Sequence, residues 1–161
     1  MLKKGFEMNR RRLLAGALTL SLSGAWAAAT LNVVVEVWKD PSCGCCKDWI
    51  AILDKAGFTV RVHETGNNGA RSQLGMPAKF GSCHTARVEG YAIEGHVPVR
   101  EIQRLLREKP KAVGLAVPGM PVGSPGMDGP IYKGRKDPFS VLLVLHDGNS
   151  SVYQSYPSAN S

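Results

Sequence analysis

The sequence has no hydrophobic run long enough to span a membrane, no long internal repeat, and no basic cluster beyond its N-terminal segment. The apolar run 13–22 is shorter than the roughly 20 residues that a transmembrane helix needs. Of the formal net charge of +7, residues 1–29 carry +4, and the other +3 comes from scattered side chains. A phosphate-tracking groove, and with it a nucleic-acid partner, is therefore not expected.

What the sequence does contain is enough apolar material for one globular domain. Its 161 residues are 43% hydrophobic and 20% charged, which is typical of a single chain with a packed core. Such a core has little need of disulfide bonds for stability.

The first 29 residues have the layout of a cleaved export signal. A basic stretch at 9–12 leads into the apolar run, which is followed by small residues at 25–29. The arginines fit either a twin-arginine (Tat) or a Sec signal, and an uncleaved membrane anchor is the alternative. No cysteine lies near the cleavage region, which excludes a lipoprotein. We expect cleavage near 27–29, a mature domain at 30–161 without stable membrane insertion, and a periplasmic location.

Periodicity and turn residues predict an α/β fold in the order β-α-β-α-β-β-α, followed by an extension. The expected elements are a strand at 31–38 buried on both faces, a helix from the cysteines to Gly57, a strand at 58–63, a short helix at 70–74, a hairpin around Glu89-Gly90, a helix opened by Pro98, a loop at 118–127 in which Pro-Gly-Met occurs twice, and a hairpin of 141–146 with 151–154. The opening resembles a thioredoxin-like domain, a mixed sheet flanked by helices.

Sulfur chemistry is concentrated in the segment Cys43-Gly44-Cys45-Cys46, which holds three of the four cysteines. The positive end of the following helix favours thiolates at its first turn, where Cys43 and Cys45 are expected. The fourth, Cys83, precedes the third predicted strand, which in a thioredoxin-like fold faces the C-x-x-C site. Four sulfurs are therefore expected to converge.

Four kinds of site are compatible with these sulfurs. Structural disulfides fit an exported protein, and a thiol-disulfide oxidoreductase would use Cys43 and Cys46 as its catalytic pair without metal. A zinc site usually has two separated ligand pairs, which this sequence lacks. A copper(I) site prefers thiolate and thioether donors. Its candidate ligands are Cys43, Cys45, Cys46 and Cys83, with Met120, Met127, Met76, His84 and His96 as further candidates.

Several segments together resemble the DUF411 family of exported bacterial metal-binding proteins. They are Asp40–Cys46, Ser82–Ala86, Gly90–Pro98 and Gly114–Met127, and the similarity spans essentially the whole mature chain. The resemblance implies a thioredoxin-like domain with a periplasmic role in copper resistance and homeostasis. In the CopG-like members it implies a thiolate-bridged multinuclear copper centre, which by matching position would use the four cysteines.

Copper(I) capture by the thiolates is therefore the predicted function, with the methionine loop closing over the metal or handing it on. Cycling between Cu(I) and Cu(II) would add an oxidoreductase activity that acts on copper rather than on protein disulfides. Copper ions are the expected partner, and periplasmic copper-efflux or redox proteins are further candidates. The metal-free oxidoreductase remains the alternative.

Overall fold

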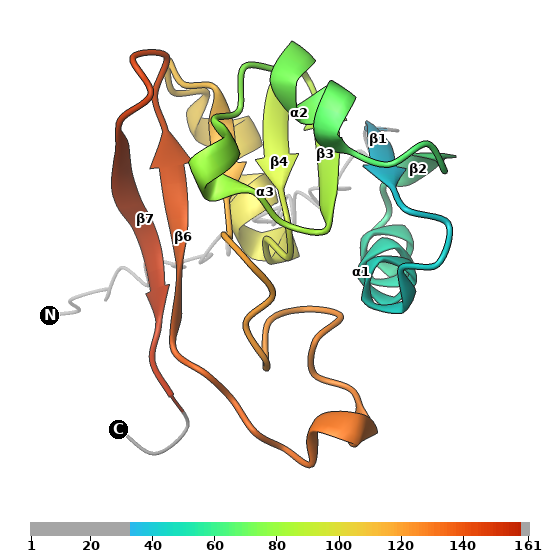
Figure 1. Ribbon diagram of the computed structural model, residues 1–161. Helices are drawn as coiled ribbons and strands as arrows, with labels where there is room; N and C mark the ends of the chain where they lie inside the picture. Colours follow the sequence, from blue (N-terminus) through green and yellow to red (C-terminus); the bar gives the residue numbers. More distant parts are fainter. Residues whose placement is uncertain (1–32, 159–161) are drawn as a thin grey trace, which may run out of the picture.

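The computed structural model describes residues 33–158, and its elements follow the predicted order (Figure 1). The elements are β1 (Val34–Lys39), α1 (Gly44–Lys55), β2 (Thr59–His63), α2 (Asn68–Gln73), the short 3-10 turn η1 (Ala78–Phe80), β3 (His84–Val88), β4 (Tyr91–Glu94), α3 (Val99–Glu108), β5 (Gly114–Ala116), the 3-10 turn η2 (Pro130–Tyr132), β6 (Phe139–Val144) and β7 (Ser150–Tyr156). The predicted export signal at 1–29 lies outside the described residues. Within 33–158, no helix is long and apolar enough to cross a membrane.

The strands form one mixed sheet in the order β2-β1-β3-β4-β5-β6-β7. Strand β1 runs parallel to β2 and antiparallel to β3, and β3 runs antiparallel to β4. This mixed sheet with flanking helices confirms the predicted α/β class. The order and directions of the first four strands are compatible with the thioredoxin-like expectation.

Helices cover both faces of the sheet, α2 in front of it and α3 behind it in the view of Figure 1. The larger core cluster joins Trp49 and Leu53 of α1, and Ile102 and Leu105 of α3, to strand residues such as Val37. A smaller cluster lies around Met76 and Phe80, where it covers one side chain each of β4, β5 and β6. The sheet is thus a middle layer, and its larger core lies under α1 and α3.

Strand β1 is buried on one face only, so the expectation of a strand buried on both faces is wrong. Val35, Val37 and Lys39 are buried, while Val34, Glu36 and Trp38 are partly exposed. The reason is that the cluster around Met76 covers β4 to β6 and leaves β1 uncovered on that side. Continuous apolar residues are typical of doubly covered strands, but they do not require a second cover.

Both predicted hairpins form at the expected turns. Strands β3 and β4 are joined by Glu89 and Gly90, which both have positive φ. A two-residue hairpin turn needs this conformation to match the right-handed twist of the strands that it joins. The second hairpin joins β6 to β7 through Asp147-Gly148-Asn149. Both turns follow from local chemistry.

The C-terminal extension belongs to the same sheet rather than to a separate unit. Strand β5 pairs in parallel with β4 and in antiparallel with β6, so it connects the hairpin β6–β7 to the central strands. Gly114 permits this pairing, because a Cβ atom there would lie 1.8 Å from the carbonyl oxygen of Ala92. Between β5 and β6 the chain makes a long loop that passes the first turn of α1.

Candidate metal centre

A tight turn brings the chain from β1 to the cysteines. The side chain of Asp40 accepts hydrogen bonds from the backbone N–H of Ser42 at 2.9 Å and from its hydroxyl at 2.5 Å. The buried ammonium of Lys39 donates to the carbonyl of Asp40 at 2.8 Å and forms an ion pair with Glu64 at 3.1 Å. These bonds fix the turn, and Cys43 becomes the N-cap residue of α1.

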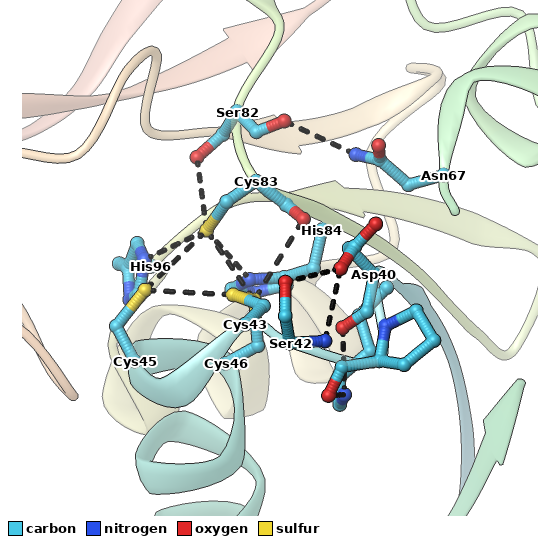
Figure 2. Close-up of a disulfide and its surroundings, with 12 residues drawn as sticks. Asp40, Ser42, Cys43, Cys45, Cys46, Asn67, Ser82, Cys83, His84 and His96 are labelled. Carbon is cyan, nitrogen blue, oxygen red and sulfur yellow. Dashed lines mark hydrogen bonds between the residues drawn. A yellow bond between two sulfur atoms is a disulfide. The ribbon is translucent and has the colours of Figure 1, made fainter. Parts of the chain in front are cut away.

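The four cysteine sulfurs converge, as predicted, with all four Sγ atoms within 4.8 Å of one another. Cys43 and Cys46 form a disulfide bond, while Cys45 and Cys83 are free thiols. The Sγ of Cys45 lies 3.6 Å from that of Cys43 and 3.9 Å from that of Cys83. The Sγ of Cys83 lies 3.5 Å from that of Cys46, so Cys83 is close to both Cys45 and Cys46 of the C-x-C-C segment (Figure 2).

Cys83 is a protonated thiol in this arrangement. Burial, and next the adjacent Cys45 thiol, raise the pKa of Cys83 to about 12. A metal ion that binds this sulfur has to displace its proton, so metal affinity at this position depends on pH.

Two buried imidazole rings extend the sulfur cluster on the side of Cys83. Its Sγ lies 3.1 Å from Nε2 of His96 and 3.4 Å from Nδ1 of His84. Nδ1 of His96 lies 2.8 Å from the carbonyl oxygen of Pro125. Because a carbonyl only accepts, this Nδ1 carries the hydrogen, and the lone pair of Nε2 faces the sulfur.

Burial keeps both rings neutral. It lowers the pKa of His84 to about 3, with the neighbouring His96 acting in the same direction, and it also lowers the pKa of His96. A neutral imidazole is the form that ligates a metal ion. Both rings are therefore available as donors at neutral pH.

An ion pair holds the backbone of Ser82, the residue before Cys83, at both its N–H and its carbonyl group. The carboxylate of Glu94 accepts from the backbone N–H of Ser82 at 2.7 Å, and Arg71 donates to the carbonyl of Ser82 at 2.8 Å. Glu94 and Arg71 pair with each other at 2.9 Å, and Thr85 donates a further hydrogen bond of 2.6 Å to Glu94. Glu94 is fully buried, and burial raises its pKa although these partners act in the opposite direction.

Besides the contact between Pro125 and His96, the loop with the repeated Pro-Gly-Met sequence lies against the site at two further points. The hydroxyl of Ser82 donates a hydrogen bond to the carbonyl of Gly119. Gly126 packs on the first turn of α1, where a Cβ atom would lie 2.7 Å from the carbonyl oxygen of Cys45. The loop therefore touches both Cys83's neighbour and the C-x-C-C segment.

The three candidate methionines lie in different environments. Met127 is buried, and its sulfur accepts a hydrogen bond of 3.3 Å from the hydroxyl of Tyr132. Met120 is 52% exposed. Met76 is buried in the smaller core cluster with Phe80 and Ala92. Among the described residues no hydrogen bond joins a methionine sulfur to a cysteine, and the roles of the methionines as ligands remain predictions.

The sulfur spacing fits metal coordination. With metal–sulfur bonds of about 2.3 Å, two sulfurs on one tetrahedral ion lie roughly 3.8 Å apart. The measured separations of 3.5 to 3.9 Å are of this size. Once the disulfide is reduced, the cluster can thus offer four sulfur donors with little rearrangement, and soft thiolates favour Cu(I).

Several residues that organise the site were missed by sequence reasoning. Arg71, Glu94 and Lys39 are charged groups far apart in the sequence, and none of them belongs to a recognisable motif. The one available signal was the position of Lys39 and Glu94 at strand ends next to the cysteine and histidine segments. Charges at buried strand ends usually need a partner.

Comparisons with known proteins agree with this chemistry. A family model described as a protein of unknown function, DUF411, matches residues 80–127, which include Cys83, both imidazoles and the methionine loop. No curated protein matches the chain.

Two solved structures are similar to the chain over nearly their whole length. They are described as copper resistance protein copG, form 1 and form 2, and are 45% and 44% identical to it, with TM-scores of 0.72 and 0.71. Each comparison covers 78% of this chain and 98% of the other. These relatives and the cysteine cluster together support a copper-related role, and the chain belongs to the DUF411 family, with the CopG-like copper resistance proteins.

Proposed function

We propose that this protein captures Cu(I) through the thiolates of Cys43, Cys45, Cys46 and Cys83, and that it does so in the periplasm as part of copper resistance. The observation that carries the proposal is the convergence of four sulfurs within 4.8 Å, at separations that suit a shared metal ion. Export would follow from the signal pattern of residues 1–29. Copper is the cargo of this site.

Capture depends on the redox state of the site, because the disulfide occupies two of the four sulfurs. A two-electron reduction by an external dithiol would convert it into two thiols and leave the external dithiol as a disulfide. Cys43 is partly exposed whereas Cys46 is fully buried, so an incoming thiolate would attack Cys43 and release Cys46. Metal ions would then displace the thiol protons.

More than one copper ion would fit the donor set. A thiolate sulfur has more than one lone pair, so each of four thiolates at separations of 3.5 to 3.9 Å can bridge two ions. This supports the multinuclear centre that the resemblance to CopG-like proteins implies. Transfer of one electron per ion to or from an external redox partner would interconvert Cu(I) and Cu(II) and give such a centre a redox activity.

The test is a copper titration of the full chain, fully reduced and kept anaerobic, with copper and free thiols counted per chain. We expect more than one Cu(I) per chain and a lower count after Cys83→Ser. Met76→Leu is measured beside it and tests the candidate ligand that is buried in the smaller core cluster; an unchanged count would remove Met76 from the candidate ligands. A reduced chain that retains no Cu(I) would refute the proposal.

The second candidate is a metal-free thiol-disulfide oxidoreductase. The disulfide at the N-terminus of α1, with one partly exposed and one buried sulfur, favours it. In that case Cys43→Ser and Cys46→Ser would each abolish reduction of a model disulfide. Cys45→Ser and Cys83→Ser would leave that reaction unaffected.

A further inference from the structure

The disulfide form of the site retains a group of three donors outside the disulfide, of which two are imidazoles that do not belong to the cysteine cluster. With Cys43 and Cys46 bonded to each other, the sulfur of Cys83 faces the two imidazole nitrogens of His84 and His96. These three donor atoms lie within 4.8 Å of one another. None of them takes part in the disulfide.

The spacing of this trio suits a single ion. Bonds of about 2.0 Å to nitrogen and about 2.3 Å to sulfur put two donors roughly 3.5 Å apart on a tetrahedral ion. The measured sulfur–nitrogen distances are 3.4 Å for His84 and 3.1 Å for His96. Movements of a few tenths of an ångström would therefore admit an ion.

Both rings are held in place by their surroundings. His96 is fixed by the hydrogen bond from its Nδ1 to the carbonyl of Pro125, the kind of contact that orients metal-binding histidines. His84 is packed against the indole of Trp49, with ring centroids 4.3 Å apart. Both histidines are fully buried, and Nε2 of His84 has no hydrogen-bond partner among the described residues.

We propose that the disulfide form carries a single-ion site made by Cys83, His84 and His96, and that this site binds Cu(II). One thiolate and two imidazoles are the donor set of blue-copper centres, where a dry environment surrounds the sulfur. Binding replaces the thiol hydrogen of Cys83 with the metal ion and releases one proton to solvent. No electron is transferred in this step.

This inference rests on the proposed function and deepens it. Cys83 is common to both sites, so the cluster and the single-ion site exclude each other. The state of the Cys43–Cys46 pair would then select which form of copper is held, several Cu(I) ions when it is reduced and one Cu(II) ion when it is a disulfide.

The test uses the full chain with Cys45→Ser, oxidised so that Cys43 and Cys46 are paired. This substitution removes the other free thiol, whose sulfur lies 3.9 Å from that of Cys83, so that Cys83 is the one sulfur of the site able to bind copper as a thiolate. We expect one Cu(II) per chain, an intense visible thiolate-to-copper absorption, and imidazole nitrogens coupled to copper in pulsed electron paramagnetic resonance. These spectra identify the donors without a histidine substitution.

Two further variants, made in the Cys45→Ser chain, complete the test. His96→Asn should lose the absorption band or bind Cu(II) about 100-fold more weakly. His146→Asn changes an exposed histidine and should leave the band unchanged. The inference would be overturned if the chain bound no copper. It would also be overturned if bound copper showed no thiolate-to-copper band or no coupling to imidazole nitrogens. The Cu(I) count of the reduced chain is a separate measurement, so either proposal can fail while the other stands.

Discussion

The carboxylate of Glu94, at the end of β4, accepts a hydrogen bond of 2.7 Å from the backbone N–H of Ser82, the residue immediately before Cys83. A fully buried charge thus sets the position of a cysteine to which it is not directly bonded. Arg71 completes the arrangement by donating to the carbonyl of the same residue.

Replacing this carboxylate should destabilise the fold and loosen the site. Glu94→Gln leaves Arg71, only 13% exposed, without its charged partner. Breaking a buried pair in this way costs about 3 kcal/mol, so the free energy of unfolding should fall by that amount in denaturant titrations. Binding of Cu(I) by the reduced variant should weaken as well.

The matched control for that variant is Glu108→Gln. It breaks an ion pair with Arg104 on the exposed face of α3, where water screens the charges. The unfolding midpoint of this variant should not change. Equal midpoints for both variants would show that the buried carboxylate does not hold the loop of Cys83.

Acid should destabilise the metal-free protein through His84. The pKa of His84 is about 3 in the folded chain because the ring is buried, whereas an unburied histidine has a pKa of 6.5. Between these values the unfolded chain binds a proton that the folded chain does not, so stability falls as the pH falls. The expected slope is about 1.4 kcal/mol per pH unit for this one group.

This slope can be measured by denaturant unfolding at a series of pH values between 6.5 and 3. His84→Phe keeps an aromatic ring against Trp49 and removes the titrating group, so the dependence should become flatter. His146→Asn, at an exposed position, should preserve it. An unchanged slope in His84→Phe would refute this assignment.

The indole of Trp49 connects α1 to the segment that carries His96. Its Nε1–H donates a hydrogen bond of 2.9 Å to the carbonyl of Val97, and the whole side chain is buried. Trp49→Phe leaves that carbonyl without a donor and opens a cavity, which together cost about 3 kcal/mol. Thermal and denaturant unfolding should both show the loss.

Trp38→Phe is the comparison for this effect. Trp38 is partly exposed and stacks on His63 at the uncovered face of β1. Its replacement should cost roughly 1 kcal/mol or less, because little buried surface is lost. A loss as large as that of Trp49→Phe would contradict the interpretation.

The two glycines of the repeated Pro-Gly-Met sequence should differ in their tolerance of a side chain. Both have positive φ, +69° for Gly119 and +82° for Gly126, so alanine strains the backbone similarly at each. Of the two, only Gly126 also lacks room for a Cβ atom, which would lie 2.7 Å from the carbonyl oxygen of Cys45. Gly126→Ala should therefore displace the loop from α1 and weaken Cu(I) binding.

Gly119→Ala serves as the control, because a Cβ atom at this position meets nothing within 4 Å. The additional destabilisation of Gly126→Ala should be about 1 to 3 kcal/mol, the usual cost of overpacking. Competition with a Cu(I) chelator measures the binding, and denaturant titration measures the stability. Equal effects of both substitutions would show that the contact at Cys45 has no consequence.

Local chemistry made much of the fold predictable. The order of elements, both hairpin turns and the helix that follows Pro98 depend on residues close together in sequence, and all were confirmed. The burial of β1 was wrong because it depends on which strands α2 and η1 cover, and that is decided by distant parts of the chain. The signal segment and the cleavage site remain predictions.

The sequence by itself determined the sulfur-rich segment, its place at the start of a helix, and the approach of Cys83 at the start of β3. Only the tertiary structure decided that two imidazoles join Cys83 and that Glu94 and Arg71 hold its loop. The tertiary structure also placed Met76 in the smaller core cluster. Turns and helix ends are set by neighbours in sequence, whereas these contacts join residues that meet only when the sheet assembles and buries them.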